Sequence, residues 1–142
     1  MRPQSIIMFE RLFLASLALG AVAFALSYDE AVALMADDPG AREFGLGSGF
    51  LIGVAAISYA VYLLLWFLIA RKASNVAKWI LVVFVALGVL FALPALTGPW
   101  GLTVALSLTV YLLEVAAVSF LFRADAKAWL AGKDRADPAA FE

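Results

Sequence analysis

The sequence predicts an all-α, polytopic membrane protein: a four-transmembrane-helix antiparallel bundle with both termini cytoplasmic. Hydrophobic residues make up 65% of the 142 residues and the mean hydropathy is +1.00, which exceeds the apolar share of a soluble domain. The apolar residues gather in four runs, each close to the length of about 20 residues that crosses a bilayer. We therefore divide the chain into a transmembrane domain, 1–123, and a cytoplasmic tail, 124–142.

The predicted membrane helices cover residues 5–27, 46–70, 77–94 and 102–122. Between the first two, a short extracytoplasmic helix is expected at about 28–36, because Ser27 and Glu30 have the spacing of a capping box. Pro39 and Gly40 would end it, since Pro cannot continue a helical hydrogen-bond ladder. Ser74 or Asn75 can cap the third helix. The tail is expected to begin as an amphipathic interfacial helix and to fray from Asp134 onward.

The orientation follows from the positions of Lys and Arg. The N-terminal segment, the connection between the second and third helices and the tail together carry nine of these ten residues, whereas the opposite side carries Arg42 alone. Because cytoplasmic segments are enriched in Lys and Arg, both termini are expected in the cytoplasm. The predicted location is a cell inner (cytoplasmic) membrane, as a multi-pass protein.

The composition excludes several classes of chemistry. The chain has no Cys and no His, which rules out thiol nucleophiles, haem ligation by His or Cys, zincin motifs and Ser-His-Asp triads. We expect no enzyme, no cofactor and no metal site, because the acidic segment from Asp29 to Glu43 lacks the spacing of an EF-hand. We expect no nucleic-acid partner, since the sequence has no basic stripe.

A polar stripe runs along the fourth predicted helix and ends at a carboxyl group. Thr103, Ser107, Tyr111 and Glu114 fall within an arc of about 80° on a helix that turns 100° per residue. A carboxylate at this depth must be paired, protonated or facing a polar cavity. Arg11 reaches a similar depth in the first helix, so an Arg11–Glu114 ion pair is the first hypothesis. The alternatives are a site for a transported ion or substrate and a contact with a partner protein.

Small residues mark the helix-packing surfaces. On the second helix, one face carries Gly45, Gly49, Gly53, Ala56 and Ala60, at the spacing that lets two membrane helices approach closely. We expect this face to pack within the chain, with homo-oligomerisation as the alternative.

The first helix has two faces of small residues. The face expected against the second helix carries Ser16, Gly20, Ala23 and Ser27. The face expected against the fourth helix carries Arg11, Ala15, Ala18 and Ala25. The second helix also carries three aromatic residues that could line a ligand crevice, Tyr59, Tyr62 and Trp66, although aromatic residues at such spacing more often serve packing.

These observations favour a small structural or accessory component of the membrane. Such a component has membrane lipid around it and binds either a membrane-protein partner or a second copy of itself. The alternative is a small transporter or channel component that uses Glu114 as an intramembrane proton or cation site. A structural role predicts a sealed bundle around Glu114, and a transport role predicts a cavity that reaches it.

Overall fold

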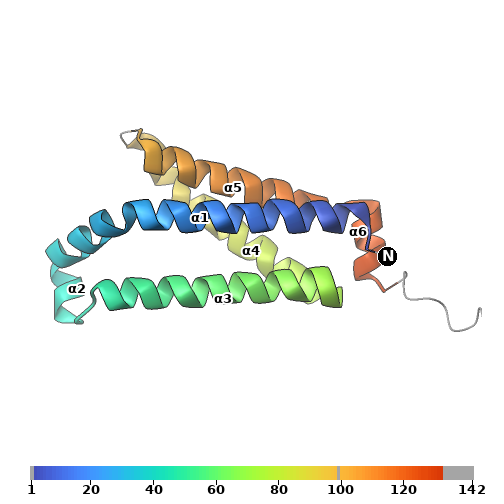
Figure 1. The fold of residues 1–142 in the computed structure, drawn as a ribbon, viewed down its shortest axis with the longest axis horizontal. Coiled ribbons are helices and arrows are strands. Elements are labelled where there is room, and N and C mark those ends of the chain that lie inside the picture. The colour runs from blue at the N-terminus through green and yellow to red at the C-terminus, as the bar shows by residue number, and fades with distance from the viewer. Residues whose placement is uncertain (1, 99, 133–142) are drawn as a thin grey trace, which may run out of the picture.

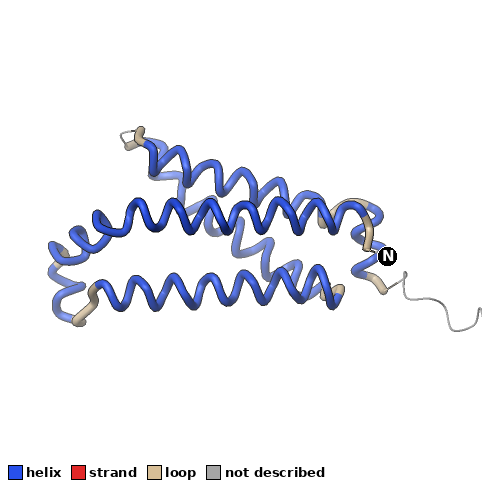
Figure 2. Tube along the Cα trace, in the orientation of Figure 1, coloured by secondary structure: helices blue, strands red, loops and turns tan. Residues whose placement is uncertain are grey.

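The computed structural model describes residues 2–98 and 100–132, and almost all of them lie in helices (Figures 1 and 2). In chain order the elements are α1 (Gln4–Asp37), α2 (Pro39–Glu43), α3 (Ser48–Lys72), α4 (Asn75–Ala92), the 3-10 helix η1 (Leu93–Thr97), α5 (Leu102–Phe120) and α6 (Ala124–Leu130). Four of them, α1, α3, α4 and α5, are long and apolar enough to cross a membrane. The chain is therefore a helical membrane protein, as the four apolar runs predict.

The first helix is longer than expected and has no break near residue 28. α1 continues to Asp37 as one helix of 34 residues. The Ser27 hydroxyl does not cap a new helix; it donates to the carbonyl oxygen of Ala23, at 3.0 Å within the same helix. A Ser in the middle of a helix can donate to a carbonyl of the preceding turn in this way. The prediction of a separate helix at 28–36, which depended on the capping-box spacing, is therefore wrong.

The turns form where the sequence places its helix-breaking residues. α1 ends before Pro39, which begins α2, and the Asp38 side chain caps α2 by accepting from the backbone N–H of Ala41 at 2.8 Å. Between α3 and α4, Ala73 adopts a left-handed conformation with φ 52°. Ser74 then caps α4 by accepting from the N–H of Ala77 at 3.2 Å. Of the two cap candidates, the structure uses Ser74.

The two ends of the molecule differ in packing. We call the end that holds the first residues of α1, the α3–α4 turn and α6 the closed end, and the end that holds α2 and η1 the open end; they lie on the right and on the left of Figure 1. Six large apolar side chains at the closed end are almost fully buried: Ile6, Phe9, Phe13, Ile69, Leu81 and Leu121. Toward the open end, side chains such as Leu34, Leu90 and Leu102 are more than half exposed. The tight core therefore occupies one half of the molecule.

The short helix α6 completes the core at the closed end. Ala126 and Leu130 are buried among the core residues of the longer helices. The Asp125 carboxylate accepts from the Ser5 hydroxyl at 2.7 Å and from the Ser5 backbone N–H at 3.0 Å. The segment expected to lie as an independent interfacial helix is thus docked on the start of α1. The part of the tail expected to fray, 134–142, lies outside the described residues.

Candidate functional site

A polar cavity of about 320 Å³ lies among the four long helices, where the core of the closed end stops. We call it the Glu114 crevice. Its lining residues are Gly20, Ala23, Phe24 and Ser27 of α1, Tyr62 of α3, Gly88 of α4, and Ser107, Val110, Tyr111 and Glu114 of α5. It is thus built from all four helices that can span a membrane.

The crevice begins at one level in every helix. In each helix, the first lining residue lies three positions along the chain from the core residue nearest the crevice. These pairs are Leu17 and Gly20, Leu65 and Tyr62, Val85 and Gly88, and Ala117 and Glu114. The core therefore forms a floor beneath the crevice, and the other lining residues extend from this level toward the open end.

Glu114 lies at this floor and has no charged partner among the described residues. Glu114 is buried, with only 5% of the residue exposed. The ion pairs of the described residues join Arg2 and Arg71 to Glu10 and Arg42 to Asp37, and none includes Glu114. Since an unpaired carboxylate in an apolar interior costs several kcal/mol, on the order of the penalties known for buried ions, the group has to be protonated or hydrated through the crevice.

Hydroxyl groups supply the other polar surface of the crevice. Ser107 and Tyr111 share the α5 face with Glu114, while Ser27 and Tyr62 contribute hydroxyls from α1 and α3. A cavity of this size with several polar groups can hold ordered water, because each water can find two or more partners. The arrangement suits a proton, a hydrated cation or a small ligand that donates hydrogen bonds.

Two glycines leave room for the tyrosine rings beside the crevice. A Cβ atom added to Gly88 would lie 3.1 Å from Cε1 of Tyr111, and one added to Gly20 would lie 3.1 Å from the Tyr59 hydroxyl oxygen. That hydroxyl donates to the carbonyl oxygen of Leu17 at 3.0 Å and so ties α3 to α1. Larger residues at either glycine would displace these rings.

The structure brings together three of the five residues predicted for the polar site. Glu114, Tyr111 and Ser107 line the crevice, whereas Thr103, one turn nearer the open end, is not among the lining residues. Arg11 is exposed and does not pair with Glu114. The hypothesis of an Arg11–Glu114 ion pair is therefore not supported, because equal depth in two helices does not make their side chains face each other.

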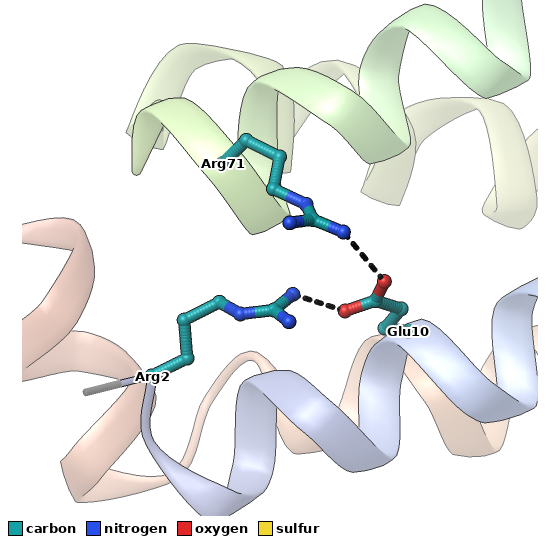
Figure 3. A network of polar contacts seen from close by, with 3 residues as sticks. All are labelled: Arg2, Glu10 and Arg71. Carbon is teal, nitrogen blue, oxygen red and sulfur yellow. Dashed lines mark hydrogen bonds and ion pairs between the residues drawn. The ribbon is translucent and has the colours of Figure 1, made fainter.

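The neighbour of Arg11 takes part in the ion pairs at the closed end instead (Figure 3). Glu10 points toward α3, accepts from Arg2 and lies 3.4 Å from Nη2 of Arg71. Consecutive helical residues point about 100° apart, so Arg11 faces away, on the same side as the exposed Ala15 and Ala18. That side of α1 was expected to contact the fourth helix. In the structure, α3 and α5 both approach the opposite side, where Gly20 meets Tyr59 and Val110 and where Ser16 is buried.

The small-residue face of α3 has no neighbour in the described chain. Gly45 lies in the turn before α3, with φ 64°, so it is not part of the helical face. Nothing lies within 4 Å of a Cβ built on Gly49 or Gly53, and Ala56 and Ala60 are exposed. The expectation that this face packs within the chain is thus not met. α3 instead turns its Tyr59, Tyr62 and Leu65 side toward α1 and the core.

Several lining residues were not among the predicted site residues. Ser27 belongs to the small-residue face of α1 and Tyr62 was considered as a crevice residue, so both carried a usable signal. Gly88 is a single glycine in an apolar run, and Phe24 is one of 11 phenylalanines. Only the relative rotation of the helices shows that these two residues reach the crevice.

The fold and the crevice define the class: a helical membrane protein with a buried carboxyl group at the floor of a polar cavity. Among residues 2–98 and 100–132, no group of three or more His, Cys, Asp or Glu side chains is placed to hold a metal ion. Comparisons of the chain with protein families, with curated proteins and with solved structures found no match.

Proposed function

We propose that this chain is a small transporter or channel component of a cell's cytoplasmic membrane, in which Glu114 binds a proton or a cation. The observation that carries the proposal is the position of Glu114 at the floor of a 320 Å³ polar cavity, without an ion-pair partner among the described residues. If Glu114 served only to fix how the helices pack, it would need a partner charge or a dry, close-packed surrounding. Intramembrane carboxyl groups that face a cavity commonly mark ion pathways.

The distribution of charge supports an orientation. The closed end carries a set of basic residues, Arg2, Arg11, Arg71, Lys72, Lys78, Arg123 and Lys127, whereas Arg42 lies at the open end beside acidic residues. By the positive-inside rule the closed end is cytoplasmic, both termini included, and the four helices form an antiparallel bundle. The crevice then extends from Glu114 toward the extracytoplasmic side, over the roughly 10 Å of helix that separate it from Ser107.

This arrangement gives the proposed site access from one side. The core at the closed end, with Phe13 and Leu17 beneath the crevice, separates Glu114 from the cytoplasm. A proton or cation arriving from outside would meet the hydroxyls of Ser27 and Ser107 before it reaches the carboxyl group. Release to the cytoplasm would require the core to open, as in alternating access.

Accessibility of single cysteines tests the proposal directly, because the chain contains no Cys. We expect Ser107→Cys, in the crevice, to react with a charged, membrane-impermeant thiol reagent added to the extracytoplasmic side. Thr109→Cys is the matched control, since Thr109 is exposed on the same helix outside the crevice and would face lipid, where thiols do not ionise. Equal protection of both positions would show that the crevice is dry and would overturn the proposal.

The role of the carboxyl group is tested by flux. Proteoliposomes that hold a pH-sensitive or cation-sensitive dye should show an ion flux with the wild-type chain, and Glu114→Gln should reduce it at least tenfold. Glu43→Gln, an exposed residue at the open end, should leave the flux unchanged. An undiminished flux in Glu114→Gln would remove Glu114 from the pathway.

The second candidate function is the accessory role, in which the chain binds a membrane partner through α3. The observation that favours it is the open face formed by Gly49, Gly53, Ala56 and Ala60 of α3. Faces of this kind let helices approach closely in lipid. A second copy of the chain or another membrane protein would cover it, and the two roles are compatible because the crevice uses other faces.

A further inference from the structure

A second polar pocket lies at the closed end, away from the Glu114 crevice, between the start of α4 and α6. Its volume is about 180 Å³, and its lining residues are Asn75, Lys78, Lys127, Leu130 and Ala131. Two of its three polar groups are ammonium groups. No carboxylate is among the lining residues.

Lys78 is the unusual member of this pocket. The residue is only 6% exposed, yet its ammonium group forms no ion pair: no carboxylate oxygen of the described residues lies within 4.0 Å of it. Its Nζ lies 4.9 Å from the ring centre of Phe122 and 5.0 Å from that of Trp79. Cation–π contacts offset part of the cost of burying an ammonium group, but they do not neutralise its charge.

Among the described residues, two carboxylates of the closed end have partners of their own. Glu10 pairs with Arg2 and Arg71, and Asp125 accepts both hydrogen bonds from Ser5. The pocket also lies at the N-terminus of the 18-residue α4, where the helix dipole favours an anion. The N-terminus of α4 therefore adds to the positive potential that Lys78 and Lys127 create inside the pocket.

We propose that the pocket formed by Asn75, Lys78 and Lys127 binds the phosphate group of an anionic phospholipid. A phosphate oxygen accepts from ammonium and amide donors, and its charge would balance those of Lys78 and Lys127. The pocket lies where α4 begins, next to Trp79, which is half exposed. Trp residues at the ends of membrane helices mark the depth of the lipid headgroups, so a headgroup phosphate reaches this level without leaving the bilayer.

The test is lipid binding by the full-length protein in mild detergent, measured by native mass spectrometry and by thermal unfolding. We expect the wild type to retain one phosphatidylglycerol in preference to phosphatidylcholine, and to unfold at a higher temperature when phosphatidylglycerol is added. Lys127→Met and Lys78→Met should each weaken this retention by about tenfold or more, since each removes a charge-assisted contact. Lys127 is exposed, so its variant is expected to fold even if Lys78→Met does not.

Lys72→Met is the matched control, because Lys72 is an exposed lysine of the same end that does not line the pocket. It should retain phosphatidylglycerol as the wild type does. Equal retention by the wild type and Lys127→Met would overturn the proposal. Thermal protection by millimolar inorganic phosphate as strong as that by phosphatidylglycerol would overturn the assignment to a lipid.

Discussion

At the scale of single residues, glycines decide how closely the tyrosine rings approach the crevice. Gly88 is in contact range of Tyr111, while Gly53 has open space around it. The same substitution at these two positions therefore has opposite expected effects. In a helix, Ala is favoured over Gly by up to about 1 kcal/mol when nothing is displaced.

We predict that Gly88→Ala lowers the free energy of unfolding by about 1–2 kcal/mol, because the new methyl group forces the Tyr111 ring to move. Gly53→Ala should raise it or leave it unchanged. Thermal unfolding in detergent measures both. Equal stabilisation of the two variants would contradict the prediction, because it would mean that the Tyr111 ring moves aside from the new methyl group at no cost.

Glu10 joins α1 to α3 through its ion pair with Arg71. We expect Glu10→Gln to lower the free energy of unfolding by about 1 kcal/mol, since these groups are only partly exposed. The loss should shrink in 1 M salt, where the Debye length falls to about 3 Å. Glu43→Gln, at the open end, is the control; a loss of the same size at both salt concentrations would point to packing instead of charge.

At the scale of elements, one carboxylate adds hydrogen bonds to the apolar contacts that dock α6. Hydrogen bonds from the Ser5 hydroxyl and backbone N–H hold the pKa of Asp125 below its ordinary value. A group whose pKa is lowered in the folded state stabilises it above the ordinary pKa of about 3.9, and this contribution is lost as the pH falls through the lowered value.

We therefore predict that Asp125→Asn lowers the melting temperature at pH 7 and that the difference from the wild type closes below about pH 4. Ser5→Ala should lower the melting temperature in the same direction. Thermal unfolding across this pH range is the measurement. A difference that stays constant down to pH 3 would show that the carboxylate charge has no part in docking α6.

The open face of α3 is the second feature at this scale. If a second copy covers it, Gly49→Leu should abolish dimers seen by cross-linking in membranes, because a large side chain keeps the two helix backbones apart. Val54→Leu is the control, since Val54 is exposed but is not one of the small residues of that face. If dimers persist in Gly49→Leu, this face is not the dimer interface and contacts lipid or a different protein.

At the scale of the whole molecule, the orientation is open to a direct test. We predict that Gly47→Cys, at the open end, reacts with an impermeant thiol reagent in intact cells. Lys72→Cys, at the closed end, should react only after permeabilisation. The reverse pattern would place the termini outside the cytoplasm and would turn the Glu114 crevice toward the cell interior.

The sequence predicts the helices of this molecule better than it predicts their contacts. Four apolar runs locate the four long helices because hydrocarbon demands about 20 apolar residues in each, and the carboxyl group that stands out in the last run, Glu114, does line a cavity. The rotation of each helix about its axis has no comparable signal. The sequence therefore predicts a contact of Arg11 with Glu114, and packing of the small residues of α3 within the chain, that the structure does not contain.

Local chemistry was ambiguous where one residue can act in two ways. Ser27 can cap a new helix or bond back to the turn before it, and both use the same hydroxyl. The choice depends on whether the chain bends at residue 28, which is a property of the whole fold. The sequence alone could not decide it.

The continuity of α1 makes it a mechanical link. At 1.5 Å per residue, 34 helical residues correspond to about 51 Å, against roughly 30 Å of hydrocarbon. The last turns of α1 bend toward α2 (Figure 1), yet one continuous helix joins the α2 turn to the crevice wall at Gly20 and Ser27 and to the core at Phe9. Because no break separates these parts of α1, a displacement of α2 would be passed along the helix backbone to the wall of the crevice.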